Sequence, residues 1–120
     1  MELFDELKEL GVNVEEGLER VMGDAPLYET MLGMFIDRVE CNPIAAEDFA
    51  AQDLEDLTGR VHALKGVTGN LAMAPLFAGY LHMLELLRAG RAGEAKAEYE
   101  RILPVQAAVM DCIRRHGSAS

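Results

Sequence analysis

The chain has 120 residues, half of them apolar and 27% charged, with a formal net charge of −10 at pH 7. This length and composition predict one globular domain over residues 1–120. The negative charge argues against nucleic acid or an anionic membrane as a partner. No apolar run approaches the roughly 20 residues that cross a bilayer, and the acidic start is unlike a secretory signal, so we expect a cytoplasmic protein.

Two short helices are predicted at the start of the chain. Leu3, Leu7 and Leu10 recur at helical spacing and indicate a first helix that ends before Gly11. A second short helix follows Asn13, a residue type that favours the N-cap, and has acidic residues in its first turn.

A longer third helix is predicted to begin at Asp24, which is a favourable N-cap. Pro26 is tolerated in its first turn, whereas Pro43 should end or kink the helix because proline lacks a donor N–H. The predicted apolar face of this helix comprises Leu27, Met31, Met34, Phe35 and Val39.

Three more helices are predicted in the second half of the chain. The first spans about residues 53–71, the next runs from Pro75 to a C-terminal cap at Gly90, and the last spans residues 93–116 with a kink at Pro104. No segment alternates in the manner of a strand, and the connections are short. We therefore expect an all-α fold, namely an antiparallel up-down four-helix bundle with short N-terminal helices.

The charged residues are unevenly distributed. Residues 1–61 contain 16 acidic and 4 basic side chains, whereas residues 57–84 contain no Asp or Glu. Burial of a helix pair explains part of this gap. A window without carboxylates is also compatible with a partner surface that is itself acidic.

His62 lies inside this window and is predicted to be exposed, because the apolar stripe through Val61 and Leu64 points elsewhere. Residues three and four positions away share its face. These neighbours are Thr58, Gly59, Lys65 and Gly66, with Gly69 one turn further. A glycine inside a helix costs about 0.5–1 kcal/mol relative to alanine, so bare positions around a histidine indicate close approach by another macromolecule.

An imidazole with an ordinary pKa near 6.5 is largely neutral and nucleophilic at cytoplasmic pH. No Ser or Cys is placed for His62 to activate, so a catalytic triad is not expected. What remains is a histidine that itself accepts a transferable group from a partner. Lys65, one turn along, offers an ammonium to phosphoryl oxygens.

The segment HALKGVTGNLA, which begins at His62, resembles the signature of histidine-containing phosphotransfer (HPt) domains. That signature combines an H-x-L-K-G core with small residues and a following N-[LI]-G. The upstream segment VEEGLERVMGDAPLYETMLGMF resembles the helical entry of this family, and LFAGYLHMLELLRAG resembles its next helix. The similarity extends from about Val12 to Arg115.

The resemblance implies a four-helix bundle with an exposed phosphoacceptor histidine midway along one helix. Such domains take a phosphoryl group from a receiver aspartate or a sensor histidine kinase and pass it to another response-regulator receiver. By position, His62 is the phosphoacceptor, Lys65 stabilises the phosphoryl group, and Gly66 admits the receiver. The docking surface would comprise Thr58, Gly59 and Gly69.

The resemblance also implies that the chain is a stoichiometric phosphocarrier and not an enzyme. We expect a monomer with no cofactor or metal of its own, because the partner receiver supplies the Mg²⁺. Two positions depart from the family pattern. Ala72 replaces the usual glycine, and Leu84 lies where a carboxylate or amide commonly steadies the histidine, with Glu85 one position on.

Two alternatives remain open. One is an HPt-like module that docks on a receiver or kinase and inhibits it without phosphotransfer. The other is a metal-binding helical bundle built around His82 and Glu85, for which further ligands are lacking and a surface pair is expected instead.

We expect structural roles for the two cysteines and for the last histidine. Cys41 and Cys112 have no metal-like spacing, and we expect both to be reduced, partly buried apolar residues. We expect His116 to interact with the last helical carbonyls.

Overall fold

A computed structural model describes residues 3–116 of the chain, which form six α-helices and one short 3-10 helix, with no strand in that range. The α-helices are α1 (Leu3–Glu9), α2 (Val14–Arg20), α3 (Ala25–Cys41), α4 (Glu55–Asn70), α5 (Ala74–Arg88) and α6 (Ala92–His116), and the 3-10 helix η1 (Ala46–Ala50) lies between α3 and α4. The prediction of an all-α fold is confirmed.

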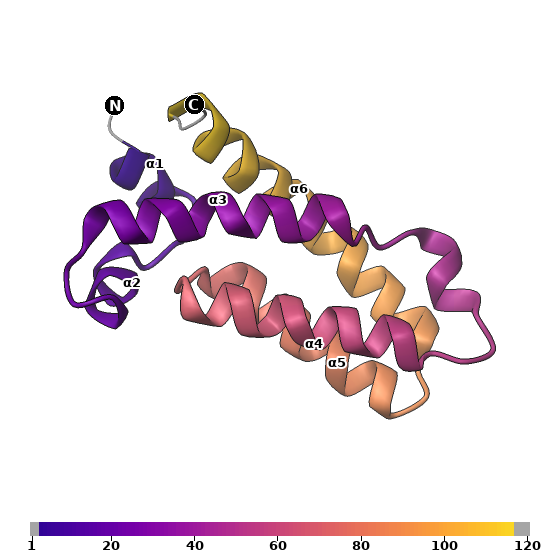
Figure 1. Cartoon of the computed structure of the whole chain (residues 1–120). Helices are drawn as coiled ribbons and strands as arrows, with labels where there is room; N and C mark the ends of the chain where they lie inside the picture. Colours follow the sequence, from indigo (N-terminus) through magenta and orange to yellow (C-terminus); the bar gives the residue numbers. More distant parts are fainter. Residues whose placement is uncertain (1–2, 117–120) are drawn as a thin grey trace.

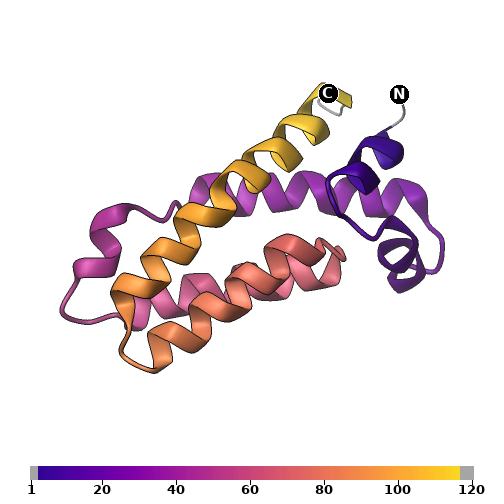
Figure 2. The same ribbon diagram turned by 180° about the vertical axis from the view of Figure 1, so that it is seen from behind.

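The helices pack into an elongated bundle that measures 43 × 24 × 21 Å. Helix α5 lies between α4 and α6 and packs extensively on both, whereas α3 makes smaller contacts with α4 and α6 (Figure 1). The view from behind shows α6 running obliquely across α3 (Figure 2). Helix α1 packs against α6, so the two ends of the described chain lie at the same end of the bundle.

The N-terminal ends of the early helices form as predicted. The Asn13 side chain accepts a hydrogen bond from the Glu16 amide, and the Asp24 side chain accepts one from the Leu27 amide, both at 3.1 Å. These caps satisfy amides that have no partner within their own helix. Helix α3 ends at Cys41, two residues before the proline that was expected to stop it.

The predicted apolar face of α3 is partly wrong. Leu27 and Met34 are 44% and 60% exposed, respectively. The residues that α3 buries are Tyr28, Leu32, Phe35 and Ile36. Tyr28 is fully buried, and its hydroxyl donates to the Leu71 carbonyl at 2.9 Å. This bond satisfies the buried polar group and joins the start of α3 to the end of α4.

Helices α4 and α5 end in the same backbone motif. The residue after each C-cap has a positive φ, +59° at Ala72 and +76° at Gly90. In α4 the Met73 amide donates to the Thr68 carbonyl at 2.9 Å, and the corresponding bond in α5 has the same length. This is the Schellman arrangement, in which glycine is the favoured residue at the left-handed position. Position 72 therefore adopts a backbone conformation that glycine favours, although the residue there is alanine.

The core is continuous through the bundle, and its largest fully buried side chains include Tyr80 of α5 and Leu7 of α1. Its two buried polar residues have partners. Thr68 donates to the Leu64 carbonyl at 2.8 Å, and Tyr80 is hydrogen-bonded to Gln106. None of the helices within residues 3–116 has both the length and the apolar content that crossing a membrane requires.

Candidate functional site

His62 lies in the middle of α4 and is exposed, as predicted. The buried side of this helix is formed by Leu57, Val61 and Leu64. Gly59, three residues before His62, and Gly66, four residues after it, are also exposed. Because residues at these spacings are neighbours on a helix surface, the imidazole lies between two helix positions that carry no side chain.

Space inside the chain does not explain these two glycines. A Cβ atom added at Gly59 or Gly66 would meet no non-neighbouring atom of the described chain within 4 Å. Neither glycine has a positive φ, so neither is required by the backbone conformation. Both positions would accept alanine at no steric cost, although alanine is the better helix former.

Gly69 differs from Gly59 and Gly66, so close approach of a partner does not explain all three glycines. A Cβ atom at Gly69 would lie 3.0 Å from the Phe77 ring on α5, and Gly69 is half-buried. Packing of α5 against α4 therefore gives Gly69 a role within the chain. Thr58, the other predicted docking residue, is half-buried one turn before His62.

Lys65 is half-buried one turn after His62 and lines a cavity of about 370 Å³ beside Gly66. No carboxylate within residues 3–116 lies within 4.0 Å of its ammonium. Arg20 of α2 lines the same cavity and pairs with Glu16 at 3.0 Å. The cavity therefore has a basic side chain, Lys65, that forms no ion pair with a carboxylate of the described residues.

A second cavity of about 680 Å³ opens where the end of α3 meets the first half of α4, and Gly59 is among its lining residues. The basic residue that α4 contributes to this cavity, Arg60, is held by Asp48 at 3.3 Å and by Asp56 at 2.9 Å. His62 lines neither cavity. Along α4 the residues that line the larger cavity lie both before and after His62, from Glu55 to Leu64, and those that line the smaller cavity begin at Lys65.

The two positions of α5 considered for orienting the imidazole lie in different environments. Leu84 is 1% exposed and belongs to the core, whereas Glu85 is exposed. Position 84 therefore supplies no carboxylate or amide that could orient the His62 imidazole.

The expected surface pair of His82 and Glu85 is wrong. His82 Nδ1 instead lies 3.5 Å from Glu98 Oε1 on α6, and Glu98 also accepts two hydrogen bonds from Arg101. The Arg101 guanidinium, helped by His82, lowers the pKa of Glu98 below its usual value. His82 therefore joins α5 to α6.

The two cysteines and His116 lie partly where the sequence predicts and partly elsewhere. Cys112 is buried as expected, but Cys41 is exposed. His116 does not turn back to the helical carbonyls, because its Nε2 lies 2.7 Å from Glu6 Oε1 on α1. The four-residue spacing of Cys112 and His116 was visible in the sequence, whereas their approach to residue 6 depends on how the two ends of the chain meet.

The surface around His62 can therefore present a nucleophilic nitrogen to a large partner, with an ammonium group one turn away for anionic oxygens. Neither of the two cavities beside this part of α4 is lined by a serine, a cysteine or a histidine of the described residues. No family model matches the chain, and no curated protein or solved structure matches it.

Proposed function

We propose that the chain is a histidine phosphotransfer protein of a two-component phosphorelay, with His62 as the phosphoacceptor. The observation that carries this proposal is the exposed imidazole of His62 between two glycines that have no packing role within the chain. The H-x-L-K-G resemblance supports it independently of the structure. In this proposal the long helices act as an antiparallel up-down four-helix bundle, with the short helices α1 and α2 as an N-terminal addition.

The transfer step is a nucleophilic displacement at phosphorus. A lone pair on a ring nitrogen of neutral His62 forms the P–N bond as the P–O bond to a receiver aspartate breaks. The electron pair of the broken bond leaves on the aspartate carboxylate, and the other ring nitrogen keeps its proton until solvent removes it. Lys65 stabilises the phosphoryl oxygens by its positive charge.

The partners in this proposal are a response-regulator receiver and a sensor histidine kinase. Gly66 allows the receiver to approach α4 closely, and Thr58, Gly59 and Gly69 contribute to the contact. The partner brings the Mg²⁺ that neutralises charge on the phosphoryl group, so the chain needs no cofactor and acts as a monomeric, cytoplasmic, stoichiometric carrier. The absence of Asp and Glu from residues 57–84 favours a partner with an acidic active site.

The test is to incubate the tag-free chain with phosphorylated receivers and with kinases, and to follow acid-labile, alkali-stable label on the chain. Wild type and the matched variant His82→Gln should become labelled, whereas His62→Gln should not. Equal labelling of His62→Gln would overturn the assignment of the phosphoacceptor. Stable binding to a receiver with no label on the wild type would instead identify an inhibitory docking module.

A further inference from the structure

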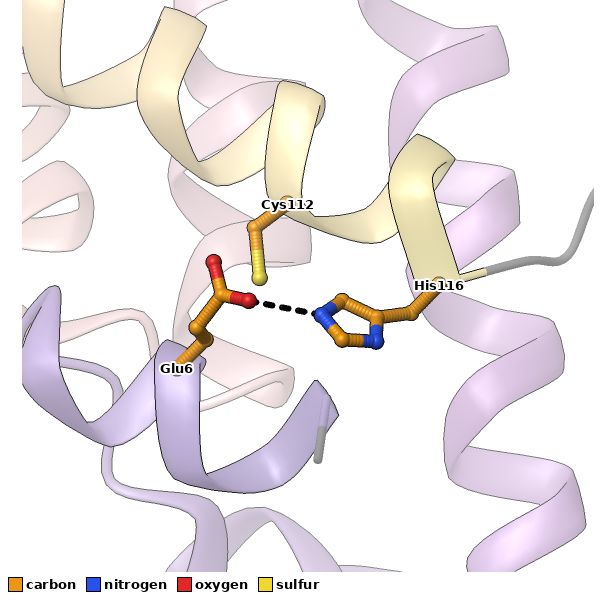
Figure 3. Close-up of side chains that lie close together, drawn as sticks. All are labelled: Glu6, Cys112 and His116. Carbon is orange, nitrogen blue, oxygen red and sulfur yellow. Dashed lines mark hydrogen bonds and ion pairs between the residues drawn. The ribbon is translucent and has the colours of Figure 1, made fainter. Parts of the chain in front are cut away.

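Three side chains with metal-binding atoms meet where α1 packs against the end of α6 (Figure 3). Glu6 comes from α1, and Cys112 and His116 come from α6. One ligand atom from each residue lies within 4.8 Å of the other two. This is the one group of three such residues within residues 3–116, and it is separate from His62 on α4.

The spacing on α6 aims two of these side chains at one point. Residues four apart lie on the same helix face, so the Cys112 sulfur and the His116 ring both face α1. Glu6 completes the group from the opposite side, with its Oε1 2.7 Å from His116 Nε2. A ligand pair on one helix and a third ligand on another is an arrangement that a metal ion can bridge.

Sulfur, imidazole nitrogen and carboxylate oxygen together are the donor types that Zn²⁺ prefers. With bonds of about 2.0–2.3 Å, a tetrahedral zinc ion holds its ligand atoms roughly 3.3–3.8 Å apart. The separation of Glu6 Oε1 and His116 Nε2, 2.7 Å, is shorter than this range, and all three ligand atoms lie within 4.8 Å of one another. Side-chain rotations that part the carboxylate from the imidazole would therefore bring the three atoms to bonding positions. A water molecule would complete the tetrahedron.

The surroundings orient the carboxylate and allow an ion to enter. Arg115 donates to Glu6 Oε2 at 2.6 Å and to Glu6 Oε1 at 3.3 Å, and is itself held by Asp111 at 2.9 Å, so its charge is partly balanced. The shorter bond to Glu6 holds its carboxylate with Oε1 toward the histidine, as outer hydrogen bonds commonly do for ligating carboxylates. Cys112 is buried, but the side chains of Glu6 and His116 remain 21% and 22% exposed.

We propose that Glu6, Cys112 and His116 form a Zn²⁺ site that fastens α1 to the C-terminal end of α6. On binding, the thiol loses its proton to solvent and binds as thiolate, and neutral His116 binds through Nε2 in place of its contact with Glu6. The ion's two positive charges are balanced by the thiolate and the carboxylate. The site is a structural clasp, independent of phosphotransfer.

The test is a titration of the metal-free, tag-free chain with Zn²⁺ by calorimetry, repeated with Co²⁺ as a spectroscopic probe. We expect one ion per chain, proton release, a rise in the midpoint of thermal unfolding, and a thiolate-to-cobalt charge-transfer band. His116→Ala and Glu6→Gln should weaken binding at least about tenfold. Cys112→Ser should also remove the charge-transfer band.

Matched variants make the result specific. Cys41→Ser, His82→Ala and His62→Gln should bind Zn²⁺ as the wild type does, because those residues lie outside the cluster. If Cys112→Ser fails to fold, His116→Ala still tests the site, since it alters a partly exposed side chain in the last turn of α6. Absence of stoichiometric binding, or equal binding by His116→Ala, would show that the cluster is a hydrogen-bonded network without metal and would overturn the proposal.

Discussion

Ala72 and Gly90 occupy the same position at the ends of successive helices, yet only one of them is the residue that the position favours. Both lie directly after a C-cap and both have a positive φ. An L-residue other than glycine is disfavoured there by about 1–2 kcal/mol, because its Cβ crowds the following carbonyl. Helix α4 therefore ends in a strained position that α5 avoids.

Replacing Ala72 by glycine should stabilise the protein. Relief of the left-handed strain outweighs the loss of a buried methyl group, which contributes at most about 0.8 kcal/mol. The expected net gain in unfolding free energy is roughly 0.5–1 kcal/mol, measured by urea denaturation. Gly90→Ala, the reciprocal variant, should lose about 1 kcal/mol, and a loss in Ala72→Gly as well would contradict this account.

Gly59→Ala and Gly66→Ala should each raise the unfolding free energy by about 0.5–1 kcal/mol, because alanine is the better helix former and its methyl meets nothing within the chain. Gly79→Ala is the matched control. Its Cβ would lie 2.5 Å from Ile102 Cγ2, so this variant should be destabilised. If the two α4 variants unfold more easily than wild type, these glycines serve the fold and not a partner.

Gly66→Leu should keep the helical content of the protein but slow phosphoryl transfer from a receiver at least about tenfold, equivalent to 1.4 kcal/mol of lost docking energy. The leucine would occupy the space through which the partner approaches His62. Gly93→Leu, at an exposed glycine in the first turn of α6, tests whether any added leucine has this effect. Unchanged transfer by Gly66→Leu would remove the proposed reason for the glycine.

Lys65→Ala should slow transfer or shorten the phosphohistidine lifetime by roughly tenfold, because one charged contact to the phosphoryl oxygens is lost. Stability should change little, since no carboxylate within residues 3–116 pairs with this ammonium. Single-turnover transfer and thermal unfolding separate the two effects, with Lys96→Ala as control. A loss of stability as large as the loss of rate would mean that Lys65 is structural.

The contact of Glu98 with Arg101 and His82 should make stability depend on pH in the acid range. The folded-state pKa of Glu98 is lowered from its usual 4.5, so its contribution is complete above that value and is lost as pH falls through the folded-state pKa. Unfolding midpoints of wild type should thus fall more steeply below pH 4.5 than those of Glu98→Gln. Parallel pH profiles for the two proteins would contradict the role of this carboxylate.

The sequence predicted the local features of the fold because their causes are local. Asn13 and Asp24 cap helices through amides three residues away, and Pro43 acts on the helix directly before it. The exposure of His62 followed from the stripe of buried residues on its own helix. Each of these inferences needs only a few consecutive residues.

The features that were missed depend on contacts between helices. Leu27 and Met34 fit the apolar period of α3 but are exposed. The helix buries the face that contains Tyr28, whose hydroxyl is hydrogen-bonded to the end of α4. Likewise, Gly69 packs against Phe77 of α5, and His82 lies beside Glu98 of α6 instead of pairing with Glu85 on its own helix. Periodicity identifies which residues share a face but not which element covers that face.

The two glycine positions beside His62 also limit how a partner could recognise α4 there. Gly59 and Gly66 offer only backbone atoms, which are the same in every α-helix. A partner that contacts α4 at these two positions would touch only helix backbone, which does not distinguish this protein from others. If the proposed function is right, discrimination between partners resides in side chains at the margin of this contact, and exchanging those residues would change which receiver the chain serves without altering His62.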